Sequence, residues 1–364
     1  MKKIVFIIGI MGNGGAERVV AILSNYLSKK EYDVSVITIY GNRQDYQLDN
    51  KVKHYPIICK SVSRILRPLE RIRKVRRVIK SIEPDSVISF LTDVNIHTLF
   101  AMIGLKYPLI LSERNDPNND PSERWQRMLR NIIYSRCDGI VFQTKDAAAY
   151  FDRILSFKIH KEIIPNPISP NLPYYSFGEN KRRFITACRL TPQKNLPLMI
   201  DAFAEIIQKG YDCMLDIFGD GPLKEELTKY IEKKQLTTKI HLCGFSKCIY
   251  DEMLNSLAFI ISSDYEGISN SMLEALAIGL PVIATDCPIG GARDSICNGV
   301  NGLLVPVGNK MELVRAMEKI LKFSELGENL SRESVKIRKL LSIDNIADKW
   351  IDIIKRVSND KGGR

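Results

Sequence analysis

No apolar run in this sequence is long enough to cross a bilayer. A membrane-spanning helix needs ~18 uncharged apolar residues, and the longest candidate, residues 96–111, is interrupted by Lys106 and Pro108. The run at residues 4–11 is short and leads into a glycine-rich segment without a cleavage pattern, which indicates a first β-strand rather than a signal peptide. Any membrane contact is therefore expected to be peripheral.

Cysteine pairs of the Cys-x-x-Cys type are also absent. The eight cysteines are scattered through a chain too long to need disulfide staples, so reduced thiols in a cytosolic protein are expected. Cys243 and Cys248, with His241 nearby, are not followed by a second pair, and we therefore expect no zinc site.

Acidic residues are too few to balance the basic ones. The chain has 364 residues, a length that favours two domains, and 53 Lys and Arg against 42 Asp and Glu give a net charge of +11. Residues 1–176 carry 27 basic and 17 acidic residues, whereas residues 177–364 carry 26 and 25. The excess suggests a polyanionic partner for the first half: nucleic acid, an anionic membrane face or a phosphorylated substrate.

The densest basic segment, residues 64–80, holds eight Lys and Arg and a single acid, Glu70. Its apolar residues recur at helical spacing, which predicts an amphipathic helix with a basic face. Such a helix can lie on anionic headgroups through Arg73, Arg76 and Arg77, or it can be an ordinary surface helix with solvated charges. The basic face also leaves a nucleic-acid-binding protein as an alternative, which the absence of interleaved aromatic residues disfavours.

Short apolar runs alternate with helical patterns along the whole chain, which predicts an α/β protein with two doubly wound, parallel-sheet domains. A segment with four prolines between residues 164 and 173 resembles a linker. We expect an N-terminal domain at 1–165, a linker at 166–180, a C-terminal domain at 181–343 and, at 344–364, a helix packing back on the N-terminal domain before a polar tail from Ser358. The expected strands are 4–9, 34–40, 87–90, 109–112, 140–143, 162–164, 184–189, 214–218, 240–243, 259–262, 282–284 and 303–305; expected helices include 16–30, 71–82 and 123–136.

Four loops between an expected strand and an expected helix are candidate ligand sites. The loop at 9–17 contains Gly14 and Gly15, but it lacks the G-x-G-x-x-G spacing and the Lys-Ser/Thr of a P-loop, so neither a dehydrogenase nor an NTPase is supported. The loop at 189–195 carries Arg189 and Lys194, two cations able to hold a diphosphate together. The loop at 218–222 is interpreted as a structural turn alone, without a ligand-binding role.

The fourth loop, residues 263–277, combines two acids with a prepared helix N-terminus. Carboxylates suit the hydroxyls of a sugar or ribose, and free helix N–H groups suit phosphate. The acids are Glu266 and Glu274, and the residues preparing the helix start are Gly267, Ser269, Asn270 and Ser271.

The spacing of Glu266 and Glu274, E-x7-E, the upstream pair Arg189 and Lys194, and the Gly-Gly-Ala-Glu-Arg segment at 14–18 resemble the retaining glycosyltransferases of family 4. The resemblance spans nearly the whole chain and implies the GT-B fold, two Rossmann-like domains facing a central cleft. A nucleotide-sugar 2-epimerase or hydrolase of the same fold is the alternative enzyme.

The resemblance also implies a role for each matched residue. Glu266 would contact the transferred sugar and Glu274 the ribose, while Arg189 and Lys194 would neutralise the leaving nucleoside diphosphate. Residues Gly14 and Gly15 would approach the diphosphate, and Gly244 and Phe245 would lie near the base. The family needs no metal and the sequence contains no Asp-x-Asp motif, so no metal or other cofactor is expected.

One position departs from the family pattern. Many members carry a His after the fifth strand of the N-terminal domain, where this chain has Arg114. Arg114 and His97 are therefore candidates for the acceptor side, although a lone His near a helix start is more often structural. No general base is assigned, because retention in this family is commonly explained by front-face attack with the departing phosphate taking the acceptor proton.

Residues 88–95 and 112–115 are similar to bacterial enzymes that build surface glycans on undecaprenyl diphosphate, some of which transfer N-acetylgalactosamine from its UDP form. This similarity implies a UDP-sugar donor carrying N-acetylgalactosamine or another hexose, and a lipid-diphosphate-linked acceptor bound by the basic half. It implies work on O-antigen, capsule or a related glycan, at the cytoplasmic face of the membrane as a peripheral protein, without a nucleic-acid partner.

Overall fold

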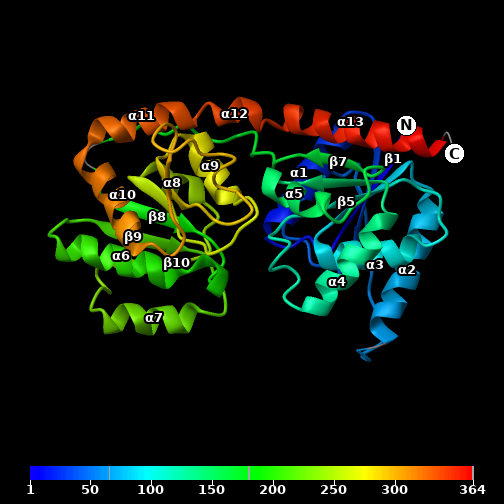
Figure 1. Ribbon diagram of the computed structural model, residues 1–364, viewed down its shortest axis with the longest axis horizontal. Coiled ribbons are helices and arrows are strands. Elements are labelled where there is room, and N and C mark those ends of the chain that lie inside the picture. Colours follow the sequence, from blue (N-terminus) through cyan, green and yellow to red (C-terminus); the bar gives the residue numbers. More distant parts are fainter. Residues whose placement is uncertain (65, 179–180, 363–364) are drawn as a thin grey trace. The chain divides into compact units, whose positions relative to one another are not determined.

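The computed structural model describes residues 1–64, 66–178 and 181–362 and divides into two compact units. The N-terminal unit is Met1–Pro167 with Leu341–Arg364, and the C-terminal unit is Ile168–Leu340 (Figure 1). Ile65, expected in the basic helix, residues 179–180 of the expected linker and the last two residues lie outside the described residues.

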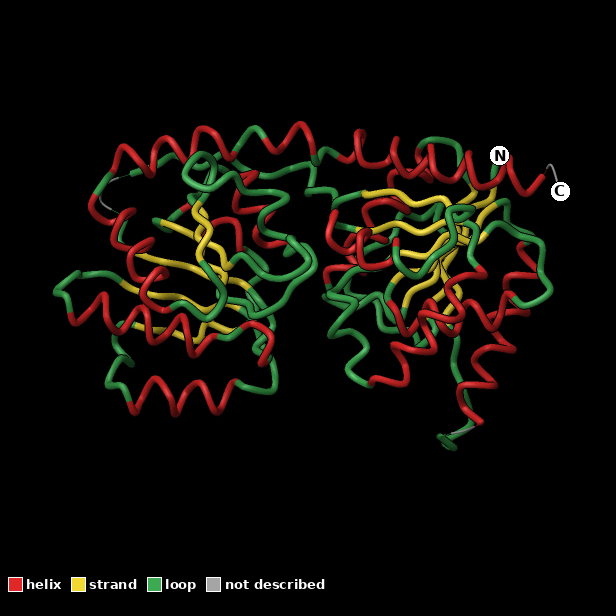
Figure 2. The backbone as a smooth tube through the Cα atoms, viewed as in Figure 1, coloured by secondary structure: helices red, strands yellow, loops and turns green. Residues whose placement is uncertain are grey.

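The N-terminal unit is built on one parallel sheet of seven strands in the order β3-β2-β1-β4-β5-β6-β7. The strands of the protein are drawn in yellow in Figure 2. Chain order reverses between β1 and β4, where Ile4 pairs with both Val34 and Ser86, so ligand-binding loops are expected at the carboxyl ends of these strands. The strands are β1(Lys3–Ile8), β2(Asp33–Thr38), β3(Lys53–Pro56), β4(Ser86–Phe90), β5(Leu109–Ser112), β6(Gly139–Phe142) and β7(His160–Ile163).

Sequence patterning missed β3 in this sheet. Its residues, Lys-His-Tyr-Pro, are only partly covered, because β3 lies at the sheet edge and pairs with β2 alone. An edge strand needs no continuous apolar run and tolerates a terminal proline. Each strand that the sequence did predict overlaps a strand of the structure, which confirms the parallel α/β architecture.

Helices cover both sides of the sheet. Helices α2, α3 and α4 form one layer, in which α3 touches both α2 and α4, while α13 packs against α1 (Figure 1). The helices of this unit are α1(Gly15–Lys29), α2(Leu66–Ile82), α3(Thr92–Met102), α4(Arg124–Ile133), α5(Lys145–Asp152) and α13(Ile343–Gly362), with a short 3-10 turn η1(Tyr134–Arg136) after α4.

The last helix, α13, belongs to the N-terminal unit although it follows the C-terminal unit in sequence. Its Trp350 is 1% exposed and stacks on Phe90 of β4, with ring centroids 5.5 Å apart. The prediction of a polar tail from Ser358 was wrong, since α13 continues through residue 362. Polar contacts explain the longer helix: Asp360 bonds to His160, and Lys361 donates to Asp138.

The C-terminal unit has a parallel sheet of six strands in the order β10-β9-β8-β11-β12-β13. Its strands are β8(Arg183–Ala187), β9(Met214–Phe218), β10(Ile240–Gly244), β11(Ala258–Ile261), β12(Val282–Thr285) and β13(Leu303–Val305). Its helices are α6(Leu196–Gln208), α7(Lys224–Lys233), α8(Ile249–Leu254), α9(Asn270–Ile278), α10(Lys310–Lys322), α11(Ser324–Ser334) and α12(Ile337–Leu340), with the 3-10 turn η2(Pro192–Lys194). Among the described residues of both units, no helix is long and apolar enough to span a membrane.

Candidate functional site

Two of the predicted loops, those after β8 and β11, meet at the carboxyl edge of the C-terminal sheet. Their strands are neighbours, so parallel pairing brings their ends together. The Asp264 N–H donates to the Gln193 carbonyl (2.9 Å), and Asn195 Nδ2 donates to the Asp264 carboxylate (2.7 Å). Gln193 Nε2 donates to the Tyr265 carbonyl (2.8 Å), so backbone and side-chain bonds hold the two loops together as one surface.

Lys194, predicted to contact the leaving diphosphate, and Glu266, predicted to contact the transferred sugar, form an ion pair on this surface. Their side chains are only 15% and 18% exposed, and the Ser263 hydroxyl also donates to Glu266 (3.1 Å). Burial by itself lowers the pKa of Lys194, but the negative charge of Glu266 and the bond to it outweigh this effect, and the pKa lies above its usual value. Lys194 therefore keeps its charge at neutral pH.

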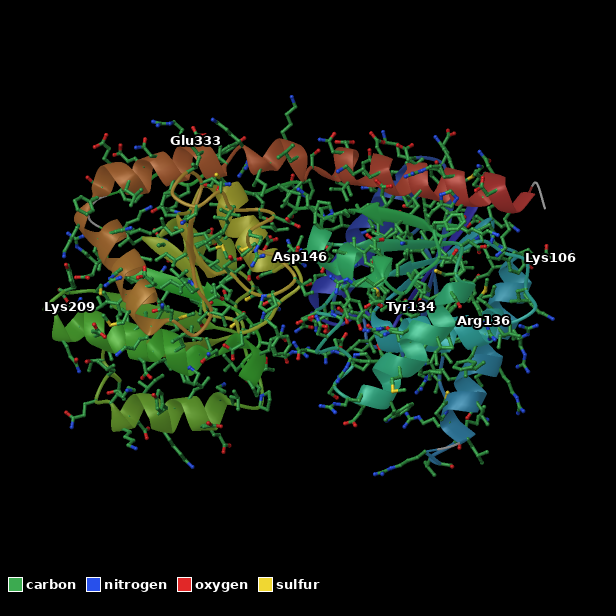
Figure 3. The ribbon with its side chains drawn as sticks, in the orientation of Figure 1. Lys106, Tyr134, Arg136, Asp146, Lys209 and Glu333 are labelled. Carbon is green, nitrogen blue, oxygen red and sulfur yellow. The ribbon has the colours of Figure 1, made fainter. Side chains whose placement is uncertain are left out.

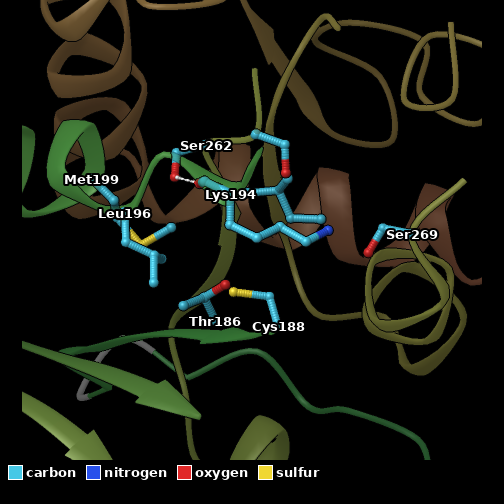
Figure 4. Close-up of a pocket in the computed structure, with 9 residues that line it drawn as sticks. Thr186, Cys188, Lys194, Leu196, Met199, Ser262 and Ser269 are labelled. Atoms are coloured by element: carbon cyan, nitrogen blue, oxygen red, sulfur yellow. Dashed lines mark hydrogen bonds between the residues drawn. The ribbon is translucent and has the colours of Figure 1, made fainter. Parts of the chain in front are cut away.

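A small cavity of about 10 Å³ lies next to the Lys194 side chain, with room for about one water molecule (Figure 4). Figure 4 shows the ammonium pointing towards the side on which Ser269 lies, while the Ser262 hydroxyl donates to the Lys194 carbonyl (2.9 Å). The Ser262 bond thus fixes the backbone of Lys194, and the ion pair with Glu266 holds its side chain.

Arg189 differs from Lys194 in being exposed, and within the described chain no partner for its guanidinium is recorded. Its loop rests on the turn Gly219–Gly221, where φ of Gly219 is +125° and a Cβ would come 1.9 Å from the Cys188 carbonyl oxygen. A Cβ on Gly221 would come 2.4 Å from the Leu190 oxygen. The sequence interpretation of this turn as local chemistry alone was incomplete, because its two glycines allow the Arg189 loop to pack closely.

The N-terminus of α9 is organised by the predicted serines. The Ser269 side chain caps the helix by accepting the Met272 N–H (3.4 Å), and the Ser271 hydroxyl donates to the Ala187 carbonyl at the end of β8 (2.8 Å). Glu274, one turn into the helix, is 4% exposed and accepts a hydrogen bond from the Tyr250 hydroxyl (2.9 Å). Asn270 begins the helix, directly after Ser269.

A fifth loop, the one after β12, lies beside this site and is not among the loops predicted from the sequence. A Cβ on Gly291 would lie 1.5 Å from the carbonyl oxygen of Gly267, so only glycine permits this approach. The adjacent pair Gly290-Gly291 after an expected strand was the signal that could have identified it.

Gly244 ends β10, and Phe245 follows it on the same edge of the sheet. Gly244 has a φ of +71° and its carbonyl accepts the Gly219 N–H (2.7 Å), which ties this loop to the turn that supports Arg189. Phe245 is 64% exposed, an unusual exposure for a large aromatic ring. Such a ring can offer a face for stacking by a planar ligand.

In the N-terminal unit, the glycine-rich loop connects β1 to α1, as the sequence predicted. Gly14 occupies the N-cap position with extended backbone, and Gly15 is the first residue of α1. A Cβ on Gly14 would lie 2.1 Å from Glu17 Oε2, so the acid of the first turn packs against this glycine.

His97 is held between helices rather than presented to a ligand. Its Nδ1 lies 2.8 Å from the Asp93 carbonyl oxygen and its Nε2 lies 3.3 Å from Arg71 Nη1, so both ring nitrogens are engaged. Burial lowers the pKa of His97, which favours the neutral ring. These contacts favour the structural role that the sequence left open, joining α3 to α2.

Arg114 is also turned inwards, contrary to the expectation that it faces an acceptor. Its guanidinium lies over the rings of Phe90 (4.6 Å) and Trp350 (5.7 Å), and Nη1 donates to Asn166 (2.6 Å). Burial lowers the pKa of Arg114 to about 9. The preceding residue, Glu113, is 2% exposed and accepts bonds from Thr92 and Tyr134. This buried polar network has no sequence pattern that identifies it.

The basic helix, α2, is present but its faces differ from the prediction. Arg71 is 8% exposed and donates to the Ile39 carbonyl (2.9 Å), whereas Leu69, one of the apolar residues at helical spacing, is 47% exposed. Arg76 donates to the Ala101 and Ile103 carbonyls at the end of α3. Of the three proposed membrane contacts, Arg73 and Arg77 are exposed, while Arg76 is committed to the fold.

Two protein families match this chain, and their matches meet close to the boundary between its two units. Residues 174–337 match the family described as glycosyl transferases group 1, and residues 13–172 match glycosyltransferase family 4. A Campylobacter jejuni protein is 30% identical over 90% of this chain and 92% of its own length; it is named as an N-acetylgalactosamine-N,N'-diacetylbacillosaminyl-diphospho-undecaprenol 4-alpha-N-acetylgalactosaminyltransferase. A second C. jejuni protein, 28% identical over 99% of this chain and all of its own length, is an alpha-1,4-N-acetyl-D-galactosaminyltransferase named for a diNAcBac-PP-undecaprenol glycan.

Solved structures agree on the fold. HepE of Anabaena, in complex with UDP and glucose, superposes with a TM-score of 0.85 at 18% identity, over 98% of this chain and 100% of that one. The sucrose-phosphate synthase of Thermosynechococcus elongatus superposes with a TM-score of 0.86 at 15% identity, over 98% of this chain and 99% of that one.

Proposed function

Because the chain belongs to the family 4 glycosyltransferases and has their GT-B fold, we propose that it transfers a sugar from a UDP-sugar to an undecaprenyl-diphosphate-linked glycan. The observation that carries the proposal is the surface formed by the loops after β8 and β11, where Lys194, Glu266 and the start of α9 lie together. The names of both Campylobacter relatives support an undecaprenyl-linked acceptor and N-acetylgalactosamine as the transferred sugar.

The donor is assigned to the C-terminal unit. The diphosphate of UDP lies between Arg189, Lys194 and the N-terminus of α9, where two cations and the positive end of the helix dipole stabilise negative charge. The exposed ring of Phe245 stacks on the base, and Glu274 receives the ribose hydroxyls. Glu266 contacts the sugar, and it can do so once the incoming diphosphate competes for the Lys194 ammonium.

The reaction retains the configuration at the anomeric carbon. The bond between that carbon and the β-phosphate oxygen breaks, the acceptor hydroxyl oxygen bonds to the same face of the carbon, and its proton passes to the departing phosphate. Negative charge therefore develops on the diphosphate, where Arg189 and Lys194 stabilise it. These two cations serve in place of a divalent metal, and neither His97 nor Arg114 is needed as a base.

The acceptor is assigned to the N-terminal unit, which holds most of the excess positive charge. A lipid diphosphate carries both negative charge and a membrane-embedded tail, so the enzyme works as a peripheral protein at the cytoplasmic face of the membrane. The exposed Arg73 and Arg77 of α2 attract the anionic headgroups. The products are intermediates of O-antigen, capsule or a related surface glycan.

The test is incubation with UDP-N-acetylgalactosamine and other UDP-sugars, with an undecaprenyl-diphosphate-linked acceptor, in the presence of a chelator. We expect one donor to give an α-linked product, which mass spectrometry and NMR identify. Glu266→Gln should abolish transfer, whereas Glu225→Gln, an exposed carboxylate on α7, should not affect it. Absence of transfer with every donor, an inverted product or full activity of Glu266→Gln contradicts the proposal. Release of free or epimerised sugar without acceptor indicates the hydrolase or epimerase instead.

A further inference from the structure

Helix α4 of the N-terminal unit buries an arginine and exposes much of its apolar surface. Arg130 is 0% exposed and lies inwards with Ile133, at 7%, whereas three large apolar side chains point outwards. Trp125 is 61% exposed, Met128 67% and Ile132 69%. An ordinary surface helix turns its apolar stripe inwards and its charges to water. The exposure of these apolar side chains on the outer face of α4 therefore requires an explanation.

The orientation of α4 is fixed by the contacts of Arg130. Its guanidinium donates from Nη1 to the Asp120 carbonyl (2.7 Å) and from Nη2 to the Tyr150 hydroxyl (2.9 Å), and it lies over the Phe151 ring at 5.0 Å. Rotating the helix to bury the apolar side chains would break these contacts of Arg130. The lost stability would be that typical of a buried charged group deprived of its partners. The apolar stripe is thus held facing outwards.

The three apolar residues follow one another on a single helix face, because positions three and seven apart lie on the same side. Arg124 precedes the stripe, and Arg136, labelled in Figure 3, follows it in η1; both are exposed. The helix itself contains no acid, and Glu123 lies just before its start. The α4 stripe, defined as Trp125, Met128 and Ile132, is therefore an apolar surface with an arginine at each end.

We propose that the α4 stripe enters the interfacial region of an anionic bilayer while Arg124 and Arg136 contact lipid phosphates. This combination of aromatic and aliphatic side chains with flanking cations is suited to the boundary between headgroups and acyl chains. It rests on the proposed function only in requiring a membrane-embedded acceptor. A second copy of the chain is a poorer occupant, since a stable interface buries roughly 800 Å² per partner and three side chains supply on the order of a few hundred.

Intrinsic fluorescence tests the proposal directly, because the chain has two tryptophans and the second, Trp350, is 1% exposed in the core. Adding vesicles of phosphatidylglycerol and phosphatidylcholine should shift the emission to shorter wavelength, and brominated acyl chains should quench it. Trp125→Phe should remove both effects. Binding to vesicles without a shift or quenching in the wild type would overturn insertion of the stripe, as would absence of binding.

A matched pair of variants keeps Trp125 as the reporter. Met128→Ser with Ile132→Ser removes two apolar anchors and should weaken vesicle binding by on the order of tenfold or more. Phe157→Ser, which alters another apolar side chain of the same unit at 90% exposure, should leave binding unchanged. Equal loss in both variants, or no loss in either, refutes the proposal.

Sedimentation and UDP titration complete the test. A wild type that dimerises, with a monomeric double variant and no vesicle binding, would identify the stripe as an interface between copies and overturn the proposal. Binding of UDP, measured by calorimetry on the same proteins, should be unaffected by the stripe. Failure of the wild type to bind UDP would contradict the donor assignment alone, whereas the vesicle result decides the role of α4 separately.

Discussion

Replacing Lys194 with alanine separates two roles that the structure and the proposed function give to one side chain. Without donor, Lys194 is ion-paired with Glu266; with donor, we propose that it contacts the diphosphate. Lys194→Ala removes both interactions, and the same change in a Glu266→Gln background removes only the second. Four proteins, the wild type, the two single variants and the double variant, therefore form a complete cycle.

The cost to stability follows from the burial of the pair. Removing one partner of a fully buried ion pair costs roughly 3–5 kcal/mol, but these side chains retain 15% and 18% exposure and Ser263 still bonds to Glu266. We expect Lys194→Ala to lose about 2 kcal/mol, which lowers the melting temperature by roughly 4–8 °C for a unit of this size. In the Glu266→Gln background no charge is stranded, and calorimetry should record less than about 1 kcal/mol.

Lys194 should contribute to donor binding with or without the Glu266 carboxylate. A hydrogen bond to a charged group contributes roughly 1.5–3 kcal/mol, so Lys194→Ala should weaken UDP about 10- to 100-fold by calorimetry in both backgrounds. The transfer rate should fall by roughly 100- to 1,000-fold, because charge develops on the diphosphate in the transition state. Unchanged UDP affinity, or a loss that disappears in Glu266→Gln, would show that Lys194 acts only through its acidic partner.

Three further predictions address the base, the loop after β12 and the membrane. Phe245→Ala should weaken UDP by about tenfold, since stacking on a base contributes roughly 1–3 kcal/mol; unchanged affinity in a calorimetric titration would remove the ring from the donor site. Gly291→Ala should lower the melting temperature of the C-terminal unit and impair UDP binding, because its Cβ meets a backbone oxygen at 1.5 Å, whereas Gly178→Ala has ordinary contacts and should be neutral; equal melting curves would refute the close approach. Charge reversal of Arg73 and Arg77 should weaken binding to anionic vesicles at least tenfold at about 1 kcal/mol per charge without altering UDP affinity, and equal sedimentation with vesicles would exclude these two contacts.

Patterns along the sequence identify the strands and loops whose formation depends on neighbouring residues. Continuous apolar runs identify the buried strands, since both faces of a parallel sheet are covered. Glycine and helix-capping residues after those strands locate the candidate loops. The pattern failed at β3, where an edge position requires no apolar run, and at the end of α13, where distant polar partners extend the helix.

Contacts between residues that are separated in the sequence could be identified only from the tertiary structure. Three contacts join segments that are separated in the sequence: the pairing of Lys194 with Glu266, the contact of the Arg114 guanidinium with the Trp350 ring, and the approach of Gly291 to Gly267. No periodicity or spacing encodes such contacts, because they depend on which strands and helices pack side by side in the folded chain.

The sequence by itself determined that the protein has two parallel α/β units and an excess of positive charge in its first half, and it supplied a set of candidate donor-binding residues in a recognisable order. These properties depend on composition, periodicity and spacing along the chain. The tertiary structure alone decided which charges are available to a ligand or a membrane. Internal hydrogen bonds hold four arginines, namely Arg71, Arg76, Arg114 and Arg130, whereas Arg189 is exposed. The difference arises because the burial and the partners of each side chain depend on what packs against it.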